Sequence, residues 1–193
     1  MPQLFVELIC ALYKPTEESG VVEEPPENLE HAQNIATQAY NVLRLWDILP
    51  GTSSDGTIDG LALLAWIAEA RKLAQAKGRG PIADQKIGEI LSASPVDEDG
   101  FWPARAVREI IEATQNGEID LGFLVGRRNR RGVTGRLPRD GGNLERMEAK
   151  HYREAAKATA LEWPRTSSLL KKMADDYDHD AHWHDQLAER IDW

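Results

Sequence analysis

The side chains best suited to chemistry lie near the end of the sequence, where acids and histidines alternate over residues 175–185. On a helix, Asp175, His179 and His182 share one face, and helical carboxylates and imidazoles at such spacing bind zinc or iron in some proteins. A second element that could supply ligands carries Glu145, Glu148 and His151. The HExxH pattern is absent, and solvated helix faces carry the same residues as i, i+4 pairs. We therefore expect no metal or other cofactor, and Asp175, His179 and His182 are the ligand candidates of the alternative hypothesis.

A second candidate site is the run of arginines over residues 127–139, which contains no acidic residue in an otherwise acidic chain. Its members are Arg127, Arg128, Arg130, Arg131, Arg136 and Arg139. Guanidinium groups beside the amides of a Gly-rich loop can hold a phosphate or a carboxylate, as in a nucleic-acid backbone, a nucleotide or an acidic partner. Internal pairing is the alternative that we favour, because the flanking helices carry Glu109, Glu112, Glu118, Asp120, Glu145 and Glu148. The cluster also lacks an aromatic residue on which a base could stack.

Two Asp-Gly loops, residues 51–62 and 95–106, share the register of the twelve-residue calcium loop. Gly56 and Gly100 take the sixth place, but the first and twelfth places hold Gly51 and Ala62 in one loop and Pro95 and Ala106 in the other. Residues 28–116 therefore resemble a degenerate EF-hand pair, in which we expect no tight calcium binding. Ordinary turns between helices explain the same pattern. We expect Trp46, Trp66, Phe101 and Trp102 to form the aromatic core of this region.

Length and composition bound the classes of function. A chain of 193 residues, 41% of them apolar, can bury a sizeable core. The single cysteine, Cys10, excludes an internal disulfide and favours a cytoplasmic location. No apolar run approaches the ~20 residues of a membrane span, and a net charge of −9 argues against nucleic-acid binding by the whole molecule. The sequence has no nucleophile elbow, P-loop or dinucleotide fingerprint, and Cys10 lies in an apolar stripe, so we predict that the chain is not an enzyme.

The apolar periodicity predicts an all-α fold of about eight helices. They are expected over residues 2–14, 28–47, 60–77, 83–93, 103–116, 118–129, 143–162 and 164–190, so that two long helices follow the central helix–loop–helix pairs. Asn28 and Asp59 are expected to cap their helices. Residues 15–27 contain five Glu and no Lys or Arg, which is typical of a linker. We therefore predict an N-terminal helix over 1–14, an acidic linker over 15–27 and one helical domain over 28–193.

Several landmarks occur in a fixed order along the chain. They are LFVELICALYKP, AYNVLRLWDILPGTSSDGTID, DQKIGEILSASPVDEDGFWPARAVREII and, from residue 129, NRRGVTGRLPRDGGNLERMEAKHYREAAKATALEWPRTSSLLKKMADDYDHDAHWHD. This order resembles the C-terminal helical region of large multidomain bacterial proteins, some of them NTPase- or repeat-bearing proteins of anti-phage defence. The resemblance covers nearly all of the chain and implies no catalytic residue. It does imply that residues 1–14 end a larger helical array.

Three functional hypotheses follow from these patterns. The first is a non-enzymatic module for protein interaction or sensor coupling, which binds a protein partner or a larger assembly through residues 132–142 or the last helix. The second is an accessory that contacts nucleic acid through the arginines of 127–139. The third is a metal-dependent enzyme built on the acids and histidines of 175–185.

Overall fold

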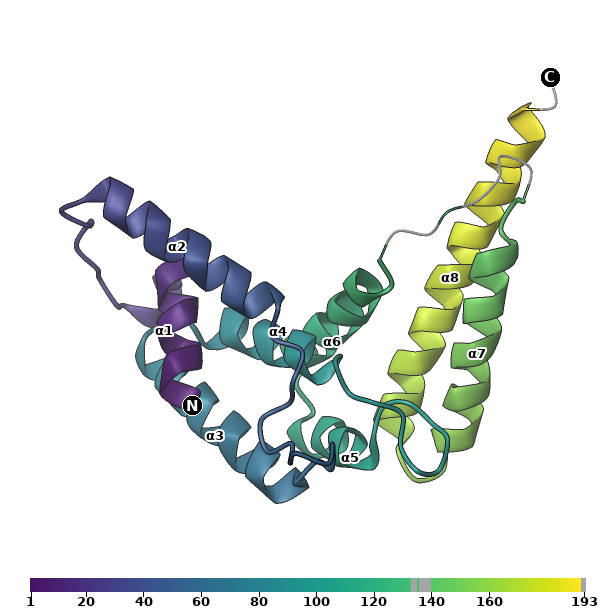
Figure 1. The fold of residues 1–193 in the computed structure, drawn as a ribbon, viewed down its shortest axis with the longest axis horizontal. Helices are drawn as coiled ribbons and strands as arrows, with labels where there is room; N and C mark the ends of the chain where they lie inside the picture. The colour runs from purple at the N-terminus through teal and green to yellow at the C-terminus, as the bar shows by residue number, and fades with distance from the viewer. Residues whose placement is uncertain (133–134, 136–139, 192–193) are drawn as a thin grey trace. The chain divides into compact units, whose positions relative to one another are not determined.

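The computed structural model describes residues 1–132, 135 and 140–191, and this part of the chain is all-helical, as predicted (Figure 1). Within it lie eight α-helices: α1 (Pro2–Leu12), α2 (Leu29–Arg44), α3 (Gly60–Ala76), α4 (Gly80–Leu91), α5 (Arg105–Thr114), α6 (Gly117–Arg130), α7 (Asn143–Thr159) and α8 (Pro164–Ile191). One 3₁₀ turn, η1 (Glu17–Ser19), lies between α1 and α2. The two long helices predicted at the end of the chain are confirmed as α7 and α8. None of the described helices is long and apolar enough to cross a membrane.

Side-chain caps begin two of the helices where the sequence predicts them. The side chain of Asn28 accepts a hydrogen bond from the amide of His31 at 3.0 Å. Asp59 Oδ1 accepts from the amides of Leu61 at 2.9 Å and Ala62 at 3.0 Å, which satisfies two donors that have no partner within α3. The start of α4 was predicted too late. This helix begins at Gly80 because Pro81 fits the first turn, where no backbone N–H is needed.

The chain forms two compact units, which are described separately. Unit 1 comprises residues 1–94 and 116–127, and unit 2 comprises residues 95–115 and 128–193. These boundaries differ from those expected from the sequence. The acidic segment 15–27 connects α1 and α2, which pack on one another within unit 1 (Figure 1).

The core of unit 1 is built around an aromatic cluster. The ring centroid of Phe5 lies 5.2 Å from that of Trp66 and 6.1 Å from that of Trp46, both in edge-on geometry. Helix α1 buries Phe5, Val6 and Ile9, whereas Leu4 is exposed. The buried stripe of α1 therefore runs through Phe5, Val6 and Ile9 and leaves Leu4 at the surface.

Helices α4 and α6 of unit 1 touch through glycines. A Cβ atom on Gly122 of α6 would lie 1.9 Å from the carbonyl oxygen of Gln85, and one on Gly88 of α4 would lie 2.1 Å from that of Ile119. The two backbones are therefore in direct contact, and only glycine fits at these positions. Ile87 and Phe123 are fully buried on the same two helices.

The core of unit 2 lies between α7 and α8, which run antiparallel side by side (Figure 1). The rings of Tyr152 and Tyr177 stack at 5.7 Å with an interplanar angle of 3°, and Trp102 meets Tyr152 edge-on at 6.1 Å. Phe101 is 36% exposed. The expectation of one aromatic core that includes Phe101 is wrong, because Trp102 belongs to unit 2 whereas Trp46 and Trp66 belong to unit 1.

Candidate interaction groove

The predicted arginine cluster is tied, in part, to acids of its own unit. Arg128 donates to Asp180 at 2.6 Å, and Arg131 donates to Glu145 at 3.1 Å. Glu145 is buried, and the guanidinium of Arg131 also lies 4.9 Å from the centre of the Tyr177 ring. A buried carboxylate requires such a partner. Internal pairing therefore holds for these two arginines.

The other members of the arginine cluster divide into two groups. Arg127 lies in α6 and ends unit 1, whereas Arg130 is the last residue of α6 and belongs to unit 2. Both make contacts within the described part of the chain. Arg136 and Arg139 lie outside the residues that the structure describes.

The acids and histidines of α8 do not gather into a ligand set. Asp175, His179 and His182 are all exposed on this helix. Two other acids of the same stretch form salt bridges: Asp178 pairs with Arg153, and Asp180 pairs with Arg128. Across the described residues, no group of three or more His, Cys, Asp or Glu side chains is arranged to hold a metal ion.

The carboxylates of the two calcium-like loops bind their own loops or an arginine. Asp55 accepts from the amide of Thr57 at 3.0 Å, and this bond lowers the pKa of its carboxyl group. Asp59 is the cap of α3. Asp99 accepts from the amide of Phe101 and pairs with Arg108. The EF-hand-like pairing is not confirmed, and the loops belong to different units.

A fully buried arginine, which the sequence analysis missed, organises the second of these loops. Arg108 donates to the carbonyls of Pro103 at 2.6 Å and Phe101 at 2.9 Å, and to both carboxylate oxygens of Asp99 at 2.6 and 2.8 Å. Its guanidinium also lies 4.6 Å from the centre of the Trp163 ring. These hydrogen bonds lower the pKa of Asp99.

A second buried arginine holds the acidic segment of unit 1 in place. Arg79 donates to the carbonyls of Tyr13 at 2.8 Å and Lys77 at 2.7 Å, and to the carboxylate of Glu23 at 2.5 Å. The amide of Thr16 donates to the carbonyl of Gly78 at 2.9 Å. The segment 15–27 is thus docked on the unit at both of these points.

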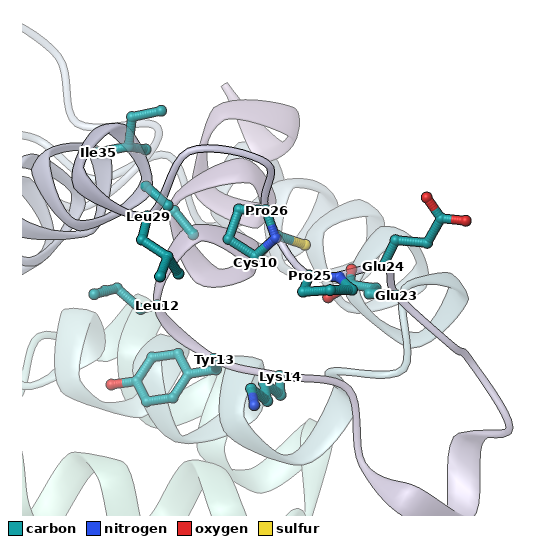
Figure 2. Close-up of a pocket in the computed structure, with 12 residues that line it drawn as sticks. Cys10, Leu12, Tyr13, Lys14, Glu23, Glu24, Pro25, Pro26, Leu29 and Ile35 are labelled. Atoms are coloured by element: carbon teal, nitrogen blue, oxygen red, sulfur yellow. The ribbon is translucent and has the colours of Figure 1, made fainter.

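This docked segment forms one wall of an open groove of about 820 Å³ in unit 1 (Figure 2). The groove lies where α1 ends and α2 begins. Leu29 and Ile35 face it from α2, Tyr13 and Lys14 lie on the opposite side, and Pro25 and Pro26 lie between. The remaining lining residues are Cys10, Ala11, Leu12, Glu23, Glu24 and Ala32. The walls are mainly apolar, and charged groups stand at the rim.

The first turns of α2 lie along the open groove. Helix α2 has 16 residues and α1 has 11, so α2 is about 8 Å longer at a rise of 1.5 Å per residue. The first turns of α2 extend past the end of α1 (Figure 1). Their inward face keeps Leu29 68% exposed and Ile35 44% exposed. Burial of the same face begins only at Ala39.

The groove suits binding better than bond-making. Burial raises the pKa of the Cys10 thiol; Arg79 and Lys77 lower it, and Glu23 and Glu7 raise it. A thiol with a raised pKa is mostly protonated at neutral pH and is a poor nucleophile. An apolar hollow with charged groups at its rim is typical of a site for noncovalent binding.

No protein-family model, curated protein or solved structure matches the chain. The resemblance to multidomain bacterial proteins stays a prediction. The sequence analysis missed the groove, although one signal for it exists. Leu29, Ala32 and Ile35 continue the apolar face of α2 beyond the length that α1 can cover.

Proposed function

We propose that this chain is a non-enzymatic helical module that binds a protein partner in the groove between α1 and α2. The observation that carries the proposal is the uncovered apolar face of α2 at an open groove, which Leu29 and Ile35 help to line (Figure 2). Burial of each of these side chains would lower the free energy by about 25 cal/mol per Å² of apolar surface removed from water. A partner that fills the groove supplies that burial.

The rest of α2 and the turn after it support an interaction role. Residues 29–48 expose six large apolar side chains: Leu29, Ile35, Tyr40, Val42, Leu45 and Ile48. Single exposed apolar residues are ordinary on protein surfaces, but a concentration of them along one segment marks interaction surfaces. We therefore place the partner surface on unit 1, whereas the sequence pattern pointed to residues 132–142 or the last helix.

A random-peptide library displayed on phage and selected against the immobilised full chain tests this proposal. Selected peptides are then measured against the double variant Leu29→Ser/Ile35→Ser. The matched control is Leu61→Ser/Leu161→Ser, which removes two equally large, highly exposed leucines away from the groove. Circular dichroism checks that each variant is folded.

We expect selected peptides to bind the wild type and the control alike, and to lose at least tenfold in affinity for the groove variant, because burial of two apolar side chains is lost. The proposal fails if the library yields no binders. It also fails if the selected peptides bind the groove variant as tightly as the wild type.

A further inference from the structure

The part of the chain that builds the groove is strongly acidic. Residues 1–43 contain seven Glu and no Asp or Arg, and their single Lys is Lys14. Glu23 and Glu24 stand at the groove itself. Lys14 lies at the groove as well, so the excess of negative charge belongs to the segment as a whole. A surface with an excess of one sign of charge attracts a ligand of the opposite sign and raises its rate of association.

These glutamates also differ from the acids of unit 2 in having few cationic partners. Within the described residues, Glu23 is the one member of the seven that forms a salt bridge, with the buried Arg79. In unit 2, by contrast, Asp99, Glu145, Glu162, Asp178, Asp180 and Asp185 each pair with an arginine. At the groove, Glu23 is therefore paired with Arg79, whereas Glu24 has no salt bridge within the described residues.

The shape of the groove indicates the secondary structure of its occupant. Leu29, Ala32 and Ile35 recur every three residues on the overhanging turns of α2, which is the spacing of a ridge that packs against another helix. An isolated bridge between Thr52 and Ile58 is all the β structure in the described chain, so unit 1 offers no sheet edge to which an extended peptide could add.

From the unpaired acids beside an apolar groove between two helix ends, we infer that the partner inserts an amphipathic helix whose apolar side chains are flanked by lysine or arginine. The inference rests on the proposed function and names the chemistry of its partner. Apolar anchors at i and i+3 or i+4 fill the space over Leu29, Ala32 and Ile35. The flanking cations lie over the glutamate-rich rim that includes Glu24.

Two labelled peptides test the inference by fluorescence anisotropy on the full chain. The first is an 18-residue amphipathic helix with Leu at i, i+3, i+4 and i+7 and Lys on the flanks. The second has Glu in place of every Lys. Glu24→Lys is the test variant, because Glu24 is exposed and forms no salt bridge or hydrogen bond within the described residues. Glu109→Lys is the control, because it makes the same charge change on an exposed position of unit 2.

At low salt we expect the Lys peptide to bind at least tenfold more tightly than the Glu peptide, with the difference falling as salt screens the charges. Glu24→Lys weakens binding of the Lys peptide about threefold, as expected for one rim charge, and Glu109→Lys leaves it unchanged. Cys10 lines the groove and is the chain's single cysteine, so its alkylation by iodoacetamide reports occupancy of the site. The Lys peptide slows this reaction at least fivefold.

The outcomes separate this inference from the proposed function. If library peptides that depend on Leu29 and Ile35 lack Lys and Arg, or if the Glu peptide binds as tightly as the Lys peptide, the inference is wrong and the proposed function stands. If the Lys peptide binds without protecting Cys10 and without sensitivity to Glu24→Lys, it binds elsewhere and the inference is likewise wrong. If no library peptide depends on the groove, the proposed function fails as well.

Discussion

The direct backbone contact between α4 and α6 makes one substitution in unit 1 unusually informative. In Gly122→Ala the new Cβ would lie 1.9 Å from the carbonyl oxygen and 2.7 Å from the carbonyl carbon of Gln85. Both are backbone atoms, so no change of rotamer can relieve the clash. Since ordinary contact begins near 3.4 Å, the two helices must separate by about 1.5 Å.

The cost in stability of separating α4 from α6 depends on the side chains that are buried between them. Ile87 of α4 and Ile119 and Phe123 of α6 are fully buried and would lose close packing. Overpacking of a core costs about 1–3 kcal/mol, and a rigid backbone clash belongs at the upper end or beyond. Alanine recovers about 1 kcal/mol of helix propensity. We therefore expect Gly122→Ala to lower the free energy of unfolding by about 2–4 kcal/mol.

Gly117→Ala is the matched control, because it makes the same change at the start of the same helix, where a Cβ would meet nothing within 4 Å. It should leave stability unchanged or raise it by up to about 1 kcal/mol. Urea unfolding, followed by circular dichroism and tryptophan fluorescence, measures both variants. If Gly122→Ala does not fold, Gly126→Ala gives the comparison, because its Cβ would lie 2.4 Å from the Ser92 hydroxyl and 2.8 Å from the nearest backbone atom, which is a smaller backbone overlap than at Gly122. If Gly122→Ala and Gly126→Ala both have a free energy of unfolding within about 0.5 kcal/mol of wild type, the close approach of α4 and α6 is refuted.

Four further expectations concern single side chains. Arg108→Ala should cost about 3–5 kcal/mol in urea unfolding, because the carbonyls of Pro103 and Phe101 lose their donor. Asp99→Ala should cost about 3 kcal/mol, because it leaves the guanidinium of the fully buried Arg108 without its carboxylate; a cost below about 1 kcal/mol for either variant would contradict this. Arg108 lowers the pKa of Asp99, so wild type should be more stable than Asp99→Asn above about pH 4, and this difference in free energy of unfolding should shrink as the pH falls further. A difference that stays constant down to pH 2 would count against this assignment. Glu112 accepts hydrogen bonds from the amides of residues 165 and 166 at 3.1 and 2.8 Å, at the start of α8. Glu112→Ala should therefore lower the free energy of unfolding by about 1–2 kcal/mol and speed amide hydrogen exchange at the start of α8. Unchanged exchange there would argue against a capping role for Glu112. Burial raises the pKa of Cys10, so its reaction with a disulfide reagent should have a pH midpoint above about 8.5; a midpoint at or below that value would overturn the assignment.

Local patterns in the sequence were sufficient to predict the helices. Asn28 and Asp59 cap helices because a short side-chain acceptor reaches amides two or three residues away, which requires no distant contact. Apolar spacing likewise predicted the two long helices α7 and α8. The start of α4 was predicted at residue 83, although proline fits the first turn of a helix and Pro81 lies in the first turn of α4.

Contacts between distant residues were decided only by the tertiary structure. Phe101 and Trp102 are adjacent and equally apolar in sequence, yet only Trp102 is buried, against the Tyr152 ring of α7. Nothing in the local sequence distinguishes Arg79 and Arg108 from surface arginines, and their burial depends on carbonyls that the folded chain presents to them. The groove exists because α2 extends past α1, which is a relation between two elements. Periodicity and capping act over a few residues, whereas burial and pairing depend on which surfaces the chain path brings together.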